Sequence, residues 1–334
     1  MKIFASAGPV LARRAALALG AAAISPAIKR SEAQTSNYPT RPVKIVVPYT
    51  PGGFTDLSAR LVAESLSKVL GQPVVVENRP GANSILGAGL VASSAPDGYT
   101  FLMVLPAHAA NATLQAGKLP FDPVSSFAPV SLVATSPLVL ASGKRMPATL
   151  REFIDYARAR EGAISYGSSG IGSTAHLAME LLQIRTGLKM MHVPYRGTQP
   201  ALQDLMAGNI GAMFDVNSAM GAQFEAGNIR ALGVASAERV SFAPSIPTFA
   251  EQGVADFTAS TWSMLLAPAG TPKPIMDRVS SEVSKIIREP AMVAKLREMG
   301  LLAEGRGPEE TGEFLNSEVT RWASVIRTGG VTVE

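Results

Sequence analysis

Two glycine-rich segments of the sequence carry residue types that bind small anions. The segment 50–56 includes Gly52, Gly53, Phe54 and Thr55, and glycine lets a ligand approach the backbone closely. The segment 166–176 contains further glycines and hydroxyl side chains, namely Gly167, Ser168, Ser169, Gly170, Gly172, Ser173 and Thr174. Each segment is expected to join a strand to a helix, where free N–H groups and the helix dipole attract a carboxylate or phosphate. Thr55 or Asp56 is expected to cap the helix after the first segment, and the alternative to a binding role is a plain turn before this capped helix.

Two more polar segments follow predicted strands and could face the same ligand. Residues 78–84 form one of these loops, which ends at Ser84. The other brings Tyr195 and Arg196 to the end of one strand, with Asp215 at the end of the next. Arg196 could pair with a ligand carboxylate through two hydrogen bonds. It could also pair with Asp215 or a surface acid, and we favour this structural role.

The other motifs predict no catalytic residue, no metal site and no cofactor. Gly167 and Gly172 have the spacing of a phosphate-binding loop, but Ser173 stands where that motif needs lysine. The segment 167–171 does not match the Gly-x-Ser-x-Gly motif of a nucleophile elbow, because Ile171 stands in place of the last glycine. Residues 87–92 match a dinucleotide-binding fingerprint, but they lie inside a predicted helix rather than at the end of a strand. The sequence has no cysteine and only three histidines, none in a close pair, so thiolate and histidine-rich metal sites are not expected.

Residues 1–33 have the pattern of an export signal peptide. Arg13-Arg14 precede a run of small and apolar residues, and Ala33 ends a small-x-small cleavage site, with a second possible cut after Ala27. Sec export is favoured over twin-arginine export, and a native helix is the third alternative. The segment holds five of the 30 basic and one of the 26 acidic residues, so the remaining chain is formally neutral. We therefore expect a periplasmic protein with no nucleic-acid partner.

Strand and helix patterns alternate along the rest of the chain, which predicts an α/β fold of mostly parallel sheets flanked by helices. Strands are expected at 43–47, 74–76, 99–105, 138–141, 164–166, 190–194, 210–214, 230–235 and 260–266. Helices are expected at 57–70, 83–94, 150–160, 173–186, 201–207, 274–288, 291–299 and 309–327.

The alternation occurs in two blocks, which predicts a two-lobed clamshell with a ligand cleft between the lobes. Lobe 1 is expected to combine 34–132 with 236–334, including the three C-terminal helices, and lobe 2 to span 133–235. The chain would cross between them near 131–137 and 233–260. Because ligands of parallel sheets bind at the carboxyl ends of the strands, both lobes should direct these ends to the cleft.

The sequence also resembles a known family over essentially the whole chain after the signal segment. The matching stretches are 38–48, Pro51-Gly52-Gly53-Phe54-Thr55-Asp56, 76–82, 95–100, Tyr166-Gly167-Ser168-Ser169-Gly170, Val193-Pro194-Tyr195-Arg196-Gly197 and 267–272. Together they resemble the Bug-type, or TctC-like, solute receptors of tripartite tricarboxylate transporters. The resemblance implies the type II periplasmic binding protein clamshell and a small carboxylate ligand held mainly by backbone and hydroxyl donors. One departure lies at Asn83-Ser84-Ile85, where many relatives have a second glycine pair.

Carried over residue by residue, the resemblance adds site roles to the segments described above. The implied ligand-binding residues are Gly52, Gly53, Phe54, Thr55, Ser168, Ser169, Gly170, Gly172, Ser173, Thr174 and Asp215; we add Ser84 and Tyr195 from their loops. The expected function is a monomeric receptor, not an enzyme, that delivers its ligand to the membrane permease subunits of a tripartite transporter. The alternatives are a ligand sensor for a signalling partner, and a periplasmic enzyme with Asp215 or His176 as its base.

Overall fold

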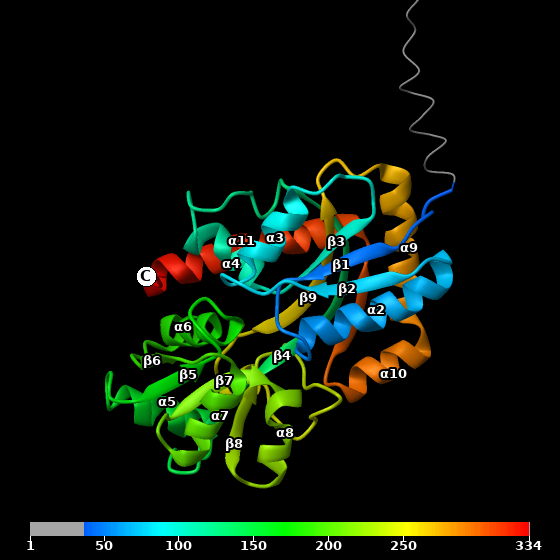
Figure 1. Ribbon diagram of the computed structural model, residues 1–334. Coiled ribbons are helices and arrows are strands. Elements are labelled where there is room, and N and C mark those ends of the chain that lie inside the picture. The colour runs from blue at the N-terminus through cyan, green and yellow to red at the C-terminus, as the bar shows by residue number, and fades with distance from the viewer. Residues whose placement is uncertain (1–36, 334) are drawn as a thin grey trace, which may run out of the picture. The chain divides into compact units, whose positions relative to one another are not determined.

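A computed structural model describes residues 37–333, so the predicted signal segment 1–33 lies outside the described residues. The fold below belongs to one unit, Pro39–Glu334 (Figure 1). No helix among the described residues combines the length and the apolar character that crossing a membrane requires.

A parallel β-α-β-α-β arrangement opens this unit, as the sequence predicts. Its elements are β1 (Val43–Val47), α2 (Phe54–Leu70), β2 (Val74–Asn78), α3 (Ile85–Ala92) and β3 (Thr100–Val104). Strand β1 pairs in parallel with both β2 and β3. Its residues Ile45, Val46 and Val47 are fully buried, which explains why an unbroken run of branched apolar residues forms this central strand.

The first sheet continues through antiparallel strands. Strand β9 (Ser260–Pro268) pairs with β3 and with β4 (Phe127–Gly143), and β10 (Leu302–Arg306) pairs with β4 on its other edge. The sequence predicts only the last part of β4 and does not predict β10. Pro129 and Pro137 interrupt the β-strand pattern in the missed part of β4, and this stretch is extended because it pairs with β9 and β10.

Strand β4 also enters a second set of strands. Its residues Phe127–Pro137 pair with β9, whereas Leu138–Gly143 pair with β7 (Ala212–Val216) and β8 (Ile229–Val234). Beyond β7 follow β5 (Ser165–Ser168) and β6 (Met191–Pro194), in parallel. One strand therefore belongs to both networks, and it changes partners between Pro137 and Leu138.

The remaining helices cover these strands. They are α4 (Ala107–Leu114), α5 (Leu150–Arg158), α6 (Thr174–Thr186), α7 (Thr198–Ala207), α8 (Asn217–Glu225), the 3-10 helix η1 (Ala250–Gln252), α9 (Lys273–Arg288), α10 (Pro290–Glu298) and α11 (Pro308–Gly329). Thr149 caps α5 in a capping box with Glu152. The short helices α4 and α8 are not predicted from the sequence, because neither begins with a side-chain cap.

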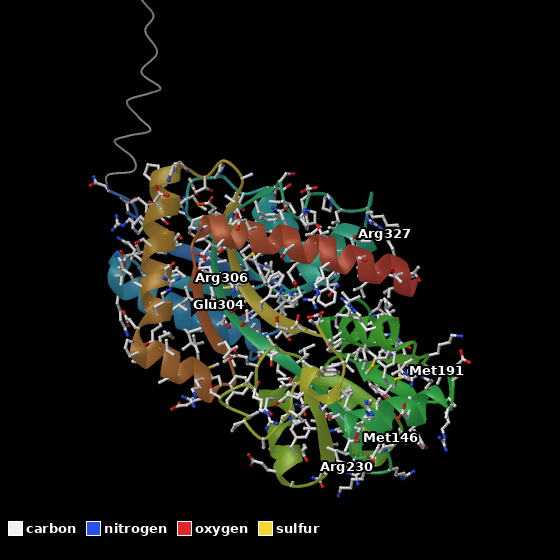
Figure 2. The ribbon with its side chains drawn as sticks, turned by 180° about the vertical axis from the view of Figure 1, so that it is seen from behind. Met146, Met191, Arg230, Glu304, Arg306 and Arg327 are labelled. Carbon is white, nitrogen blue, oxygen red and sulfur yellow. The ribbon has the colours of Figure 1, made fainter. Side chains whose placement is uncertain are left out.

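The C-terminal helices pack against earlier elements of the chain. Helix α9 contacts α2, β4 and β10, while α11 contacts α4, β4 and also α6. Beneath α11, the carboxylate oxygen Glu318 Oε2 accepts hydrogen bonds from the indoles of Trp262 and Trp322, at 2.7 and 2.9 Å. Figure 2 shows α11 from behind, with Arg306 beside its start and Arg327 near its end.

Candidate ligand-binding site

A cavity of about 440 Å³ lies where the two strand networks meet. Its volume is in the range of pockets that hold small molecules. Leu138 of β4, Thr261 of β9 and the last two residues of β7 line it, together with loops that follow β1, β2, β3, β5 and β6. As the sequence predicts, these loops lie at the carboxyl ends of strands.

Helix starts surround this cavity. The first residue or the N-cap of six helices lies in its lining, at Phe54 (α2), Ser84 (α3), Ala107 (α4), Ser173 (α6), Thr198 (α7) and Val216 (α8). Helix N-termini carry partial positive charge and unpaired N–H groups. No lysine, arginine or histidine lines the cavity within the described part of the chain. The helix starts are therefore the main positive feature of the lining.

Six of the thirteen predicted site residues line the cavity. They are Phe54, Ser84, Ser169, Ser173, Thr174 and Asp215. The other seven, Gly52, Gly53, Thr55, Ser168, Gly170, Gly172 and Tyr195, lie outside the lining. Polar lining residues that sequence reasoning did not select are Tyr49, Thr50, Asn83, Thr198 and Thr261. Thr50 and Asn83 belong to the segments 50–56 and 78–84, which the sequence predicts to line the site. What the sequence does not show is that these two residues face the cavity.

The β1–α2 loop is held by Asp56, which is 2% exposed. Its Oδ2 accepts hydrogen bonds from the Gly52 N–H and from Arg60 Nε, each at 2.9 Å, and its Oδ1 accepts one from Asn78 Nδ2 at 2.9 Å. Burial raises the pKa of Asp56, but the bonds from Arg60, Gly52 and Asn78 outweigh burial and leave it below 3.8. The loop is thus fixed by a buried carboxylate.

The predicted helix cap at Thr55 or Asp56 is wrong. Helix α2 begins at Phe54, and Gly53 is its N-cap, without a side-chain cap. Asp56 lies in the first turn and reaches back to Gly52, which has a φ of 85°. An aspartate near the start of a helix can cap the helix or accept a hydrogen bond from an N–H of the preceding loop. The residue type alone does not distinguish these two roles.

The loop before α3 has an unusual backbone. Ala82, Asn83 and Ser84 have φ values of 46°, 49° and 77°, so three consecutive residues other than glycine adopt left-handed conformations. Asn83 and Asn111 hold this loop in place. Asn83 Nδ2 donates to Asn111 Oδ1 at 3.2 Å, and Asn111 Nδ2 donates to the Asn83 carbonyl at 2.8 Å. The sequence departure at Asn83-Ser84-Ile85 therefore shapes the cavity wall.

Three buried hydroxyls lie on this side of the cavity without a hydrogen bond of normal geometry in the described residues. They are Tyr49 Oη, Thr55 Oγ1 and Ser84 Oγ. Burial raises the pKa of Tyr49 to about 12, although the nearby Ser84 side chain and Leu105 backbone lower it. A buried hydroxyl without a partner costs about 1–3 kcal/mol, so such groups usually meet water or a ligand. Tyr49 and Ser84 line the cavity and can meet either there.

The β5–α6 loop is held from behind by two histidines. Ser168 Oγ lies 2.7 Å from His192 Nε2, and the Gly172 N–H donates to His176 Nδ1 at 3.1 Å. The two imidazole rings stack with centroids 3.8 Å apart. Burial, with a smaller contribution from His192, lowers the pKa of His176 to about 3, and burial lowers that of His192 to about 4. Both rings are therefore neutral and position the loop that presents Ser169 and Thr174.

Asp215 is the only carboxylate in the described cavity lining. Its Oδ2 accepts a hydrogen bond from Thr198 Oγ1 at 2.6 Å, and its Oδ1 accepts one from the Val216 N–H at 2.8 Å. Burial raises the pKa of Asp215, and these two bonds only partly oppose the change.

The side chains of the β6–α7 loop point to other partners. The Tyr195 hydroxyl donates to Asp204 Oδ2 at 2.6 Å, and Tyr195 does not line the cavity. Arg196 is exposed and forms no ion pair with Asp215 or with any other acid of residues 37–333. The ion pair expected for Arg196 is thus not formed.

The described cavity lining supplies groups that can bind an anion. His176 is 5% exposed, lies outside the lining and uses Nδ1 to accept the Gly172 N–H. In the described residues, no three side chains of the histidine, aspartate or glutamate type gather as metal ligands. The cavity offers N–H and hydroxyl donors, apolar walls such as Phe54, and one carboxylate.

Comparison with known proteins agrees with these features. Residues 58–331 match the family model TctC, described as tripartite tricarboxylate transporter family receptor. The chain is 36% identical over 303 residues to protein BugT of Bordetella pertussis, which covers 89% of this chain and 92% of BugT.

Solved structures show the same fold. The R. palustris protein Rpa4515 with adipate has a TM-score of 0.79 at 37% identity, covering 88% of this chain and 99% of that one. The periplasmic binding protein BugD has a TM-score of 0.76 at 32% sequence identity, and the alignment covers 89% of this chain and 100% of BugD. MatC from Rhodopseudomonas palustris with bound malate has a TM-score of 0.75 at 33% sequence identity, and the alignment covers 86% of this chain and 100% of MatC. The family match and these alignments span nearly the whole described chain, and the chain therefore belongs to the TctC family, the Bug-type receptors of tripartite tricarboxylate transporters.

Proposed function

We propose that this protein captures a small carboxylate in the 440 Å³ cavity and delivers it to the membrane permease subunits of a tripartite transporter. The observation that carries the proposal is the convergence of six helix starts on one cavity whose described lining has no cationic side chain. Such a lining suits an anion held by backbone and hydroxyl donors. The adipate and malate bound by Rpa4515 and MatC support the ligand class.

The energetics are adequate without an ion pair. Charge-assisted hydrogen bonds contribute about 1.5–3 kcal/mol each. Micromolar binding corresponds to about 8 kcal/mol, so several such bonds can support it even after the cost of immobilising the ligand. Ser169, Thr174 and Ser84 are placed to contribute hydroxyl donors. The apolar wall at Phe54 favours a ligand with a short hydrocarbon chain.

The setting follows from the same proposal. We place the mature protein in the periplasm, after cleavage of the signal at 1–33, as a monomer without a cofactor and without catalytic activity. Lobe 1 would comprise 34–132 and 236–334, and lobe 2 would comprise 133–235. The change of partners in β4 at Pro137 and Leu138 supports a lobe boundary near these residues.

Native mass spectrometry followed by titration calorimetry tests the proposal. Protein purified without denaturation should carry a co-purified small acid, and a panel including adipate, malate and citrate should contain a ligand that binds saturably with one molecule per chain. Incubation with the same acids, analysed by chromatography, should leave them unchanged. Absence of binding across the panel, or conversion of any acid, would contradict the proposal.

A further inference from the structure

A second cavity, of about 570 Å³, lies apart from the first and shares no lining residue with it. Helix α5, the end of α6 and the segment after η1 form its walls. Its volume is again in the small-molecule range. Nothing in the proposed function uses it.

Charge distinguishes this second cavity from the first. Arg151, Arg158 and Arg185 all line it, and Asp155 is its only acidic lining residue in the described chain. Asp155 Oδ1 pairs with Arg158 NH1 at 3.1 Å, and Arg158 NH2 also donates to the Thr186 carbonyl at 3.1 Å. Arg151 and Arg185 form no ion pair or side-chain hydrogen bond with the described residues. Two guanidinium groups are therefore left without compensation at one concave surface.

The arginines are presented by fixed elements. Arg151 and Arg158 are seven residues apart on α5, so they lie on the same face of the helix, two turns apart. The Leu150 N–H donates to Gln252 Oε1 at 3.4 Å, and Gln252 Nε2 donates to the Leu232 carbonyl at 2.7 Å. These bonds tie η1 to the start of α5 and hold the opposite wall. Ile154 and Val254 add apolar surface.

We propose that this cavity is a second anion site, which binds a multivalent phosphate or carboxylate through Arg151, Arg158 and Arg185. Planar guanidinium groups bind such oxyanions through paired hydrogen bonds, and arginine is suited to this geometry. A bound oxyanion also supplies the negative charge that Arg151 and Arg185 lack, since Asp155 already pairs with Arg158. The oxyanion is either a free solute or the phosphate of an anionic lipid headgroup, and the same residues would bind both.

Titration calorimetry with inorganic phosphate and with pyrophosphate at constant ionic strength tests this site. The variant is the double substitution Arg151→Gln/Arg185→Gln, and the matched control is Arg145→Gln. Arg145 is also exposed and lies in neither cavity, and among the described residues it donates only to the Ala207 carbonyl, at 3.4 Å. We expect saturable binding that the double substitution weakens at least about tenfold and the control leaves within about twofold. Binding should also weaken as sodium chloride is raised.

Two further experiments distinguish a free oxyanion from a lipid phosphate, and binding in the second cavity from binding in the first. The first is sedimentation of the native protein and of the double variant with phosphatidylglycerol vesicles. If the double substitution weakens binding to the vesicles but not to phosphate or pyrophosphate, the oxyanion is the phosphate of a lipid. The substitution Ser169→Ala/Thr174→Ala in the first cavity should leave phosphate binding unchanged, so loss of carboxylate binding there does not affect this result. The second site is ruled out if phosphate, pyrophosphate and vesicles all bind the native protein and the double variant equally.

Discussion

Thr198 Oγ1 donates a 2.6 Å hydrogen bond to Asp215 Oδ2, which joins the start of α7 to the end of β7 at the cavity wall. The Val216 N–H bonds the other carboxylate oxygen at 2.8 Å, so the carboxylate is fixed in one orientation. Burial nevertheless raises the pKa of Asp215 above 3.8. An ionised Asp215 would repel a carboxylate ligand, which makes ligand binding sensitive to its protonation.

Ligand affinity should therefore increase as the pH falls from neutrality toward the raised pKa of Asp215. Binding of an anion beside this carboxyl favours its protonated form, so binding takes up a proton and Kd falls by up to about tenfold per pH unit. Calorimetry in two buffers of different ionisation enthalpy measures the proton uptake. The comparison is Asp215→Asn with the same ligand, which also corrects for titration of the ligand. Equal pH slopes in the two proteins would show that Asp215 is not coupled to binding.

The same raised pKa predicts how stability depends on pH in the absence of ligand. A carboxyl whose folded pKa is raised stabilises the fold below its unfolded pKa, and this contribution is lost as the pH rises through the folded value. Relative to Asp215→Asn, the native protein should thus lose stability as the pH rises from about 3.8 through the raised pKa of Asp215. Urea unfolding of both proteins at several pH values measures the difference. A difference that stays constant with pH would contradict the assignment.

Gly172 and Gly53 should respond differently to alanine, although sequence reasoning treats them alike. Gly172 has a φ of 75°, and a Cβ there would lie 2.5 Å from Leu114 Cδ1 of α4. Strain of this kind costs about 1–3 kcal/mol, so Gly172→Ala should weaken ligand binding at least about tenfold. Gly53 has a φ of −80°, and its nearest neighbour would be Thr50 O at 3.9 Å, so Gly53→Ala is the matched control. Titration calorimetry on variants that keep the native circular dichroism spectrum measures the affinity. Equal losses of ligand affinity in the two variants would show that backbone strain at Gly172 is not the cause.

Arg196→Gln should change ligand affinity less than about twofold. Arg196 is exposed, lies outside the cavity lining and forms no ion pair in the described residues. The anion would then be held by N–H and hydroxyl donors rather than by a cation. If titration shows that Arg196→Gln abolishes binding while Gly172→Ala leaves it intact, a side-chain cation holds the ligand and the proposed mode of binding is wrong.

Asp56→Ala should destabilise the protein by about 2–3 kcal/mol, because it leaves the Gly52 N–H without its acceptor and removes one of the two acceptors of Asn78 Nδ2. The exposed Asp277, paired with Lys273 at 2.7 Å, is the matched control, and Asp277→Ala should cost at most about 1 kcal/mol. Chemical denaturation measures both. Because the folded pKa of Asp56 is lowered, its contribution is complete above pH 3.8 and should be lost as the pH falls through the folded value. If the stability difference between the native protein and Asp56→Ala persists at low pH, it does not come from the ionised Asp56 carboxylate.

Local sequence signals determine the order of most of the strands and helices, though not β10, α4, α8 or the first part of β4, and they determine the loops that carry the site. The apolar run at β1 and the glycine after α2 are such signals, since burial and a left-handed helix end can be read from a few neighbouring residues. The strand-to-helix loops at 50–56 and 166–176 follow from this order. Their residues meet at the cavity because parallel strands align their carboxyl ends.

Only the tertiary structure decides which side chains of those loops face the cavity. Ser169 lines it while the adjacent Ser168 bonds His192, and Asp56 closes a loop instead of capping a helix. The double pairing of β4 depends on partners at least 70 residues away. The arginine-lined cavity likewise combines α5 with the distant residue Arg185. Such outcomes depend on long-range packing, which periodicity over a few residues cannot report. Local pattern sets most strands and helices, but the first part of β4 and strand β10 again depend on their distant partners.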